Sequence, residues 1–277
     1  MYIAIDIGGT TTRVMGSRDF QAFTDPVLYN TPTDPEQRFS KLVETIDQVA
    51  EGQPTAVAVG VAGPVDADGR TGKTPHLAGW ENYPLGEKLS TEIAVPVYVK
   101  NDTALVGLGE ATKGAGQGHK IVVYITVSTG VGGARIIKGE IDETVHGYEP
   151  GHHIIDTNDG PDGGPIYAED YLSGTAMEKK HGSKPQDITD RGVWDDWEEK
   201  LAMFLNNITV TMDPEIIVLG GGLIVKNTNT NFDHVVERFG HYERIFEKAP
   251  VLKKAQLGDL GGAWGGFELL KQKAGTQ

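Results

Sequence analysis

The sequence predicts an α/β protein made of two halves that begin alike. Short apolar runs typical of buried strands alternate along its 277 residues with segments whose apolar residues have helical spacing. A strand, a turn with glycine and threonine, and a second strand occur at the start of the chain and again at residues 120–136. Ligands of α/β folds bind at the carboxyl ends of strands, so both turns are candidate binding sites.

The first turn has the composition of a phosphate cradle. An apolar run ends at Asp6, and the turn residues that follow are Gly8, Gly9, Thr10, Thr11, Thr12 and Arg13. Glycines let backbone N–H groups approach an anion closely, and the threonine hydroxyls add donors. Asp6 would repel a phosphate, so we expect it to hold a hydrated metal ion. An ordinary β-hairpin turn with polar residues is the alternative.

The rest of the first half alternates between helices and strands. Apolar residues at Phe39, Leu42, Val43, Ile46 and Val49 predict a helix over 35–50, and a second helix is expected over 85–93. A buried strand over 55–65 ends at a Gly-Pro pair that begins with Gly63, and another strand covers 95–102. The segment after the first turn is expected to return as its hairpin partner.

The second half repeats this opening. Residues 120–136 predict a strand, a turn at Thr129 and Gly130, and a second strand. A strand over 215–223 runs into three glycines, and residues 262–274 predict a closing helix. The polar stretch 182–197 predicts no clear element. We expect two lobes, each carrying one phosphate-binding turn, that face a shared cleft.

Composition narrows the class of protein. A net charge of −14 and a pI near 5.0 argue against nucleic-acid binding, which favours a basic surface. An acidic protein that binds phosphate needs backbone amides, helix N-termini or Mg²⁺. The absence of cysteine excludes disulfides and thiolate metal sites. With no apolar run of membrane-spanning length and no signal-like N-terminus, we expect a cytoplasmic protein without a membrane partner.

Two further segments carry candidate chemistry. Asp102, after a strand, can accept a proton from a hydroxyl that attacks phosphorus, and Asn101 can orient that substrate; the alternative is an Asx cap for a helix over 103–111. Glu149, His152 and, later, Glu169 lie in a Gly/Pro-rich region and suit the hydroxyls of a sugar. A metal site of His152, His153, Asp156 and Asp159 matches no known spacing.

Glycine-rich segments have competing interpretations. The glycines at 220–222 permit close approach of a nucleobase or ribose, but a tight strand-to-helix turn would use them equally well. The segment with Gly130, Gly132 and Gly133 superficially matches a dinucleotide fingerprint. It has no third glycine at the required spacing, and a strand rather than a helix follows it. The P-loop and protein-kinase signatures are absent.

Taken in order, these segments resemble the ROK family (repressor, open reading frame, kinase), the glucokinase-like branch of the actin/hexokinase ATPase superfamily. The similarity covers nearly the whole chain. The matching segments are residues 6–10 with Arg13, 60–66, 77–80, 96–102, 128–133, 149–153, 169–174 and 219–223.

This resemblance implies a two-lobed actin/hexokinase-like (ribonuclease H-like) ATPase fold. The N-terminal lobe would comprise residues 1–107, with a C-terminal helix over 262–277 returning to it, and the C-terminal lobe residues 108–261. The implied activity is ATP-dependent phosphorylation of the 6-hydroxyl of a hexose, with glucose as the leading substrate. A cytoplasmic homodimer that binds hexose and nucleotide is also implied.

The resemblance assigns a role to each candidate residue. Asp102 would be the general base, and Asp6 would support Mg²⁺ through water. The sugar-binding residues would be Gly63, Asn101, Asp102, Glu149, His152 and Glu169. The nucleotide-binding residues would be Asp6, Gly8, Gly9, Thr10, Thr11, Arg13, Thr129, Gly130, Gly132, Gly221 and Gly222.

Two departures from the family pattern matter. The cysteines of the family zinc motif are replaced by Gly160, Asp162 and Tyr167, so no zinc is expected. No helix-turn-helix precedes Met1, which disfavours a repressor. The open alternatives are a kinase for fructose, mannose or an N-acetylhexosamine, a polyphosphate donor, a non-catalytic sugar sensor and, least favoured, a dinucleotide oxidoreductase.

Overall fold

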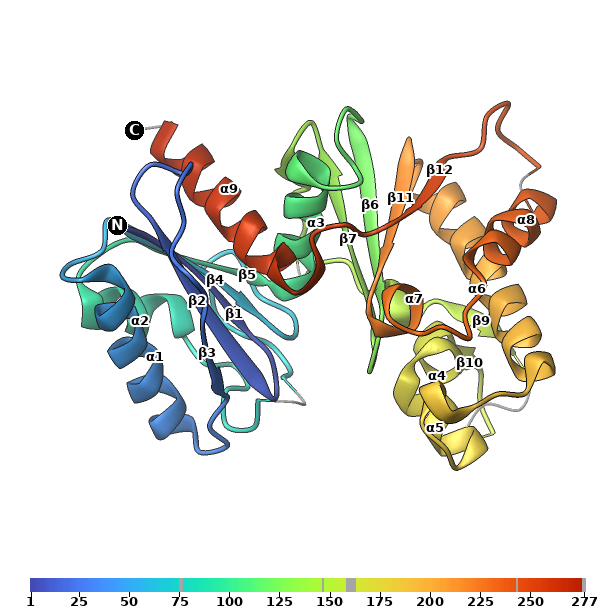
Figure 1. Ribbon diagram of the computed structural model, residues 1–277, viewed down its shortest axis with the longest axis horizontal. Coiled ribbons are helices and arrows are strands. Elements are labelled where there is room, and N and C mark those ends of the chain that lie inside the picture. Colours follow the sequence, from blue (N-terminus) through green and yellow to red (C-terminus); the bar gives the residue numbers. More distant parts are fainter. Residues whose placement is uncertain (75–76, 146, 158–162, 243, 276–277) are drawn as a thin grey trace. The chain divides into compact units, whose positions relative to one another are not determined.

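The computed structural model describes residues 1–74, 77–145, 147–157, 163–242 and 244–275. The chain forms two compact units, each built on its own sheet (Figure 1). The first unit contains Met1–Gly114, Gly139–Gly147 and Leu257–Gln277, and the second contains Ala115–Lys138 and Tyr148–Gln256. Within the described residues, no helix combines the length and apolarity needed to cross a membrane.

The sheet of the first unit brings three predicted site segments to one edge. Its strands are β1 (Tyr2–Ile7), β2 (Thr11–Ser17), β3 (Val27–Asn30), β4 (Ala56–Val61) and β5 (Val97–Asn101), in the order β3-β2-β1-β4-β5. Strands β1, β4 and β5 run parallel, and Val61 pairs with both Ile7 and Asn101. The carboxyl ends of these strands therefore lie side by side, and the residues that follow them share one edge.

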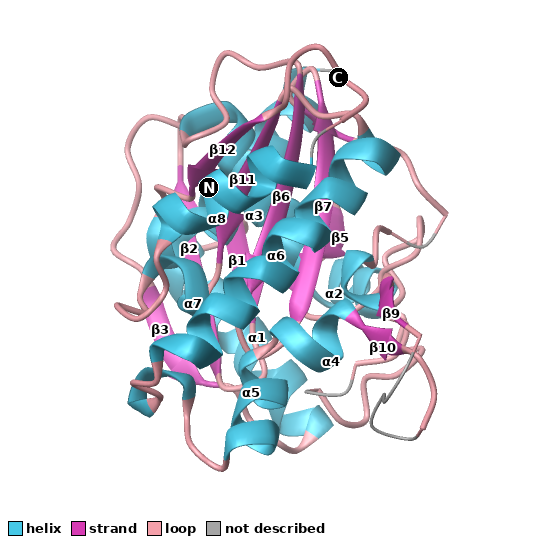
Figure 2. Cartoon of the chain, turned by 90° about the vertical axis from the view of Figure 1, so that its right-hand side faces the viewer, coloured by secondary structure: helices cyan, strands magenta, loops and turns pink. Residues whose placement is uncertain are grey.

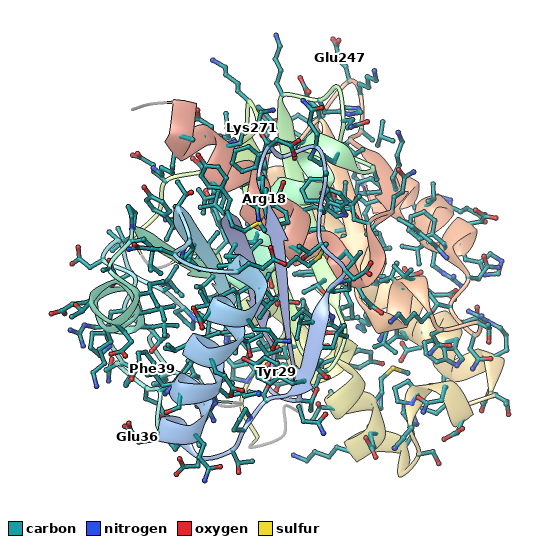
Figure 3. All side chains as sticks on the ribbon, turned by 60° about the vertical axis from the view of Figure 1, so that its left-hand side comes forward. Arg18, Tyr29, Glu36, Phe39, Glu247 and Lys271 are labelled. Atoms are coloured by element: carbon teal, nitrogen blue, oxygen red, sulfur yellow. The ribbon has the colours of Figure 1, made fainter. Side chains whose placement is uncertain are left out.

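Helices cover both faces of this sheet. These are α1 (Pro35–Ala50), α2 (Leu85–Ile93), α3 (Asp102–Lys113) and α9 (Gly261–Gly275), which follows the 3₁₀ turn η3 (Gly258–Leu260). Apolar residues of α1 and α2 pack on one face, where Tyr29 and Phe39 lie partly buried against the core (Figure 3). On the other face, α9 packs against α3 so closely that a Cβ on Gly265 would lie 1.7 Å from the Leu105 carbonyl oxygen. Only glycine allows this contact.

The second unit has a sheet of similar construction. Its strands are β6 (Ile121–Val127), β7 (Val131–Ile137), β11 (Ile216–Gly220) and β12 (Val251–Lys254), in the order β12-β11-β6-β7, with the short β8 (Glu140–Ile141) next in the chain after β7. Its helices are α4 (Ala168–Leu172), α5 (Gly174–His181), α6 (Arg191–Met212), α7 (Gly222–Val225) and α8 (Phe232–Tyr242). Figure 2 shows the long helix α6 lying across this sheet. Trp194, Trp197 and Phe204 of α6 are fully buried in the core between them.

The structure confirms the predicted helices over 35–50 and 85–93 at the same residues and refines other elements. The third helix begins at Asp102, one residue before its predicted start, and the strand predicted over 55–65 ends already at Val61. The polar stretch 182–197 contains the 3₁₀ turn η2 (Pro185–Asp187) and the first turns of α6. Its polarity hid this helix, since only one face of α6 is buried.

Candidate functional site

The first turn is a β-hairpin whose carbonyl groups are held from one side. The Gly8 amide donates to the Thr11 carbonyl oxygen at 3.0 Å. Thr31, directly after β3, donates its hydroxyl to the Gly8 carbonyl at 2.7 Å and its amide to the Thr10 carbonyl at 2.9 Å. Because a trans peptide directs its C=O and N–H oppositely, the amides of Gly9 and Thr11 point away from Thr31. The first turn is thus a β-hairpin, as the alternative interpretation holds, and two of its amides face away from the Thr31 support.

Asp6 lies in an acidic environment beside this turn. It pairs with Arg13 across β1 and β2, with 3.4 Å between the Arg13 Nη1 and Asp6 Oδ2 atoms. Burial and the negative charge of Asp102 raise the pKa of Asp6 to about 6, although Arg13 opposes the shift. A carboxylate in this setting favours a cation, and oxygen ligands with water are what Mg²⁺ prefers. The residues therefore fit a hydrated Mg²⁺.

Asn101 and Asp102 begin helix α3. The Asn101 Oδ1 atom accepts from the Ala104 amide at 3.1 Å, and its Nδ2 donates to the Gly63 carbonyl at 3.0 Å. Asn101 is thus the helix cap, as the alternative interpretation proposed for this pair, and it also fixes the loop after β4. Asp102 is the first helical residue, and its Oδ1 accepts from the Thr103 amide at 2.7 Å.

Gly63 occupies a position that only glycine can take. Its φ is +112°, and a Cβ would lie 2.7 Å from the Lys73 carbonyl oxygen. The Gly63 carbonyl is the acceptor for Asn101. The structure therefore brings Gly63, Asn101 and Asp102 together at the edge of the first sheet.

The second turn, in the other unit, is held in the same manner. The Ser128 amide donates to the Gly130 carbonyl at 2.9 Å. The start of helix α5 supplies the support: the Gly174 amide donates to the Ser128 carbonyl at 2.7 Å, and the Thr175 hydroxyl donates to the Thr129 carbonyl at 2.9 Å. The amides of Thr129 and Gly130 consequently point away from α5.

The predicted sugar-binding residues of this unit gather around Val131. The Glu169 carboxylate, in the first turn of α4, accepts from the Val131 amide at 2.7 Å. The 3₁₀ turn η1 (Pro150–His152) packs against β7 so closely that a Cβ on Gly151 would lie 2.3 Å from the Val131 carbonyl oxygen. Glu149 caps this turn, since its carbonyl accepts from the His152 amide at 3.1 Å.

Other predicted residues near these have structural surroundings. Gly132 lies in β7 opposite Thr126. His153 is half-buried with its ring against Phe204, and burial lowers its pKa. Tyr167 ends the short strand β10 (Ile166–Tyr167), which pairs with β9 (Ile154–Asp156). Asp159, Gly160 and Asp162 lie outside the described residues.

A pocket of about 460 Å³ opens beside the second turn. It is lined by Ser128, Thr129, Gly174, Thr175, Glu178, Lys184, Pro185, Gln186, Gly222, Leu223, Lys226 and Asn227. Thr129 and Gly222, both predicted to bind nucleotide, therefore border one cavity. Sequence patterns did not predict the lining between residues 175 and 186, because no periodicity or motif connects those residues to either turn.

The glycine run shapes this pocket. Gly221 has φ +86°, and a Cβ there would lie 2.2 Å from the Val127 carbonyl oxygen, so only glycine fits. A Cβ on Gly222 would meet open space. The run is a tight strand-to-helix turn between β11 and α7, as the alternative interpretation holds, and it also lines a cavity.

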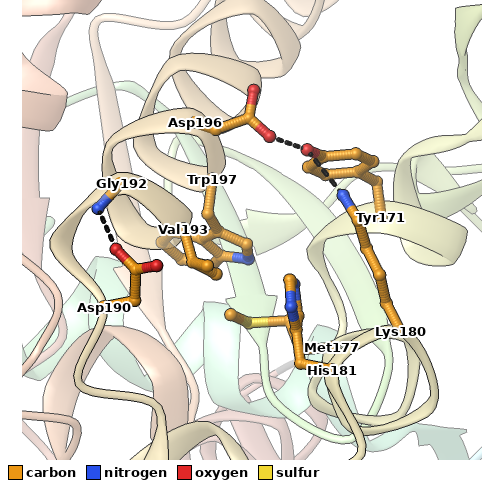
Figure 4. Close-up of a pocket in the computed structure, with 9 residues that line it drawn as sticks. All are labelled: Tyr171, Met177, Lys180, His181, Asp190, Gly192, Val193, Asp196 and Trp197. Atoms are coloured by element: carbon orange, nitrogen blue, oxygen red, sulfur yellow. Dashed lines mark hydrogen bonds between the residues drawn. The ribbon is translucent and has the colours of Figure 1, made fainter.

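A second cavity of about 270 Å³ lies between α5 and α6 (Figure 4). Several of its polar side chains are paired with one another: Lys180 donates to the Tyr171 hydroxyl at 3.1 Å, and that hydroxyl donates to Asp196. Asp190 accepts from the Gly192 amide at 2.8 Å. None of the candidate site residues within the described part of the chain lines this cavity.

One group of described residues could in principle hold a metal ion: Asp195, Glu198 and His234. Arg238 lies 2.8 Å from Glu198 and 3.0 Å from Asp195, and Arg191 lies 2.5 Å from Glu198. Two guanidinium groups already neutralise these carboxylates and would repel a cation. The group is therefore an ion-pair network between α6 and α8.

Comparisons with known proteins identify the family of the chain. The model of the ROK family matches residues 2–273. The fructokinase of Lactococcus lactis subsp. cremoris is 31% identical over 240 residues, which cover 81% of this chain and 80% of the relative. The glucokinase of Halalkalibacterium halodurans is 27% identical, covering 98% and 95%. The N-acetyl-D-glucosamine kinase of Haemophilus influenzae is also 27% identical, covering 99% and 100%.

Solved structures have the same fold. The ROK hexokinase from Thermus thermophilus has a TM-score of 0.87, with 24% identity and 99% of both chains covered. The ROK family glucokinase from Streptomyces griseus, in complex with glucose and AMPPNP, has a TM-score of 0.80, with 24% identity and coverage of 98% and 99%. A ROK family transcriptional regulator, a homolog of the E. coli MLC protein, has a TM-score of 0.85, with 18% identity and coverage of 98% and 77%.

The family match extends over nearly the whole chain, and the structural matches span both units. The chain therefore belongs to the ROK family and has the mixed α/β, two-sheet, actin-like ATPase fold.

Proposed function

We propose that the chain is an ATP-dependent sugar kinase that phosphorylates the 6-hydroxyl of a hexose, with glucose as its first candidate substrate. The observation that carries the proposal is the pocket beside the second turn, which Thr129 and Gly222 both border. A nucleotide matches this chemistry, because amides of the turn suit its phosphates and the adjoining cavity suits its base and ribose. The relatives named as sugar kinases support the same activity.

In this proposal, Asp102 is the general base. It accepts the proton of the sugar hydroxyl while the hydroxyl oxygen forms a bond to the γ-phosphorus and the bond to the bridging oxygen of ADP breaks. Backbone amides of the turns would bear the charge that develops on the transferred group. Mg²⁺, supported by Asp6 through water, would neutralise phosphate charge when bound.

Both units would supply sugar ligands. We assign Gly63, Asn101 and Asp102 in the first unit and Glu149, His152 and Glu169 in the second to the sugar hydroxyls. The remaining nucleotide ligands would be Gly8, Gly9, Thr10, Thr11, Arg13, Gly130, Gly132 and Gly221. We further propose a cytoplasmic homodimer, the form that the family resemblance implies.

A different sugar is the first alternative, because relatives include kinases named for fructose and for N-acetyl-D-glucosamine. A non-catalytic sugar sensor is the second, because a ROK regulator has the same fold. The placement of Asp102 beside the acidic group at Asp6 weighs against a sensor, which needs no general base.

The test is a coupled ADP-release assay with Mg²⁺-ATP on glucose, fructose, mannose, N-acetylglucosamine and N-acetylmannosamine. Asp102→Asn removes the proton acceptor and retains the shape of the side chain, so we expect turnover to fall by about 10²–10⁴-fold with sugar binding retained. Near-normal turnover in this variant would refute the assignment of the base. No turnover on any sugar, with ATP or with polyphosphate as donor, would favour the sensor.

A further inference from the structure

We propose that Thr31 and Thr175 are positioning residues, whose hydroxyl groups set the direction of the phosphate-binding amides in the two turns. This inference rests on the proposed function. Neither residue belongs to a glycine motif or was a candidate from the sequence. Each supports a turn in its own unit, and each does so through the same kind of hydrogen bond.

Thr31 supports the first turn from a buried position. The residue is 8% exposed, and its hydroxyl donates to the Gly8 carbonyl at 2.7 Å. The Thr12 and Thr31 hydroxyl oxygens are 2.9 Å apart. Since the single hydroxyl proton of Thr31 goes to Gly8, Thr12 is the donor in that pair. A chain of two hydroxyl groups therefore ends on the Gly8 carbonyl.

Thr175 supports the second turn from the start of α5. Its hydroxyl donates to the Thr129 carbonyl at 2.9 Å, whereas its amide reaches the same oxygen only at 3.4 Å. The shorter bond is the stronger one, so the hydroxyl contributes most of the support. Thr175 is exposed and also lines the 460 Å³ pocket.

The residue after each supported carbonyl explains why support is needed. The two peptide groups concerned join Gly8 to Gly9 and Thr129 to Gly130. Rotation of a peptide group by half a turn requires a positive φ at its second residue, which glycine adopts without cost. Such a rotation would turn a carbonyl oxygen toward the bound phosphate in place of the N–H group. The threonine hydroxyl opposes this rotation by holding the carbonyl.

The test compares isosteric and conservative variants at both positions. Thr31→Val and Thr175→Val retain the shape but lose the hydroxyl, and Thr31→Ser and Thr175→Ser keep the hydroxyl. We expect each valine variant to raise the KM for Mg²⁺-ATP or to lower kcat by about tenfold, with the KM for the sugar within about twofold of wild type. Each serine variant should recover most of the loss.

Matched controls separate positioning from general stability. Thr45→Val removes a buried hydroxyl that donates to the Lys41 carbonyl within α1, and Thr211→Val removes an exposed one that donates to Asn207 within α6. Both should lower the thermal midpoint without a selective change in the KM for ATP. Valine variants at 31 and 175 that behave like these controls, or serine variants as impaired as the valine ones, would overturn the inference.

Calorimetric titration with Mg²⁺-ADP distinguishes failure of the proposed kinase activity from failure of the positioning role of Thr31 and Thr175. If wild type binds Mg²⁺-ADP but turns over no sugar, the proposed kinase fails, and the inference stands or falls on whether the valine variants bind about tenfold more weakly. If wild type binds no nucleotide, both the kinase and the positioning role are wrong.

Discussion

The two turns have the same construction in different surroundings. In each turn, donors from a segment distant in sequence bind two carbonyl groups. One of the two donors is a threonine hydroxyl, which binds the carbonyl of the residue before a glycine. The first turn lies beside Asp6, whose pKa burial and Asp102 raise to about 6, whereas the second opens onto a pocket of about 460 Å³. From this difference we propose a division of roles, in which the first turn supplies charge and a metal site and the pocket at the second turn fits the nucleotide.

The largest expected effect concerns the steric constraints of the second turn's pocket. Gly221→Ala places a Cβ 2.2 Å from the Val127 carbonyl oxygen at φ +86°. Backbone strain and overpacking together should lower the free energy of unfolding by about 2–6 kcal/mol in urea denaturation. Gly222→Ala is the matched control, because its Cβ meets open space. Equal stability of the two variants would contradict this account of the glycine run.

The second effect concerns the charge at the first turn. Because the pKa of Asp6 is raised from 3.8 to about 6 on folding, the folded protein binds its proton more tightly than the unfolded chain. Stability is therefore lost as pH rises from about 4 to about 6, by up to about 3 kcal/mol. Asp6→Asn should remove this loss, so in Mg²⁺-free buffer it should melt higher than wild type at pH 7.

The control for this prediction is the pH dependence itself. Thermal midpoints of Asp6→Asn should change less than those of wild type between pH 4 and 6. If the thermal midpoint of Asp6→Asn changes between pH 4 and pH 6 as much as that of wild type does, a group other than Asp6 causes the pH dependence. Loss of the Arg13 contact in the variant works against the stabilisation, since Arg13 favours the ionised Asp6.

A smaller effect is expected from the carboxylate at the second turn. Glu169→Ala leaves the Val131 amide without its acceptor, at a cost of about 1–3 kcal/mol in the free energy of unfolding. Glu169→Gln keeps an acceptor oxygen and should lose much less. Hydrogen exchange at the Val131 amide should become faster in the alanine variant alone, and equal exchange in both variants would rule out this role of Glu169.

The smallest effect is expected at the start of the first turn. Gly8 has no positive φ, and a Cβ there would lie 3.1 Å from the Thr11 carbonyl oxygen. A shift of a few tenths of an ångström would accommodate Gly8→Ala, so we expect a loss of about 1 kcal/mol or less. A loss as large as that of Gly221→Ala would show that the first turn is sterically as constrained as the glycine run.

Local patterns predicted much of the fold. The spacing of apolar residues indicated helices α1 and α2 at their observed bounds, and the paired strands around both turns were expected from their composition. The resemblance to the ROK family was confirmed by a match over residues 2–273. The start of α6 was missed, because its exposed face is polar and its buried tryptophans are few.

The support of the site could not be predicted in the same way. Thr31 is 23 residues from Gly8, and Thr175 is 46 residues from Thr129, so these pairs arise only when the chain has folded. For Asn101, the sequence allowed two interpretations, a helix cap or a sugar ligand. The structure shows that Asn101 caps α3, and its role as a sugar ligand stays a prediction. The roles of the candidate residues in binding and catalysis remain predictions.

The most direct test of the account is the response of the turn amides to nucleotide. Backbone ¹⁵N–¹H NMR spectra of the protein would be recorded during titration with Mg²⁺-AMPPNP, following Gly9, Thr11, Thr129 and Gly130. We predict that all four amide signals shift with one common binding constant, because phosphates contact both turns. Shifts confined to pocket residues such as Gly222, with the four amides unmoved, would contradict the claim that these turns bind phosphate.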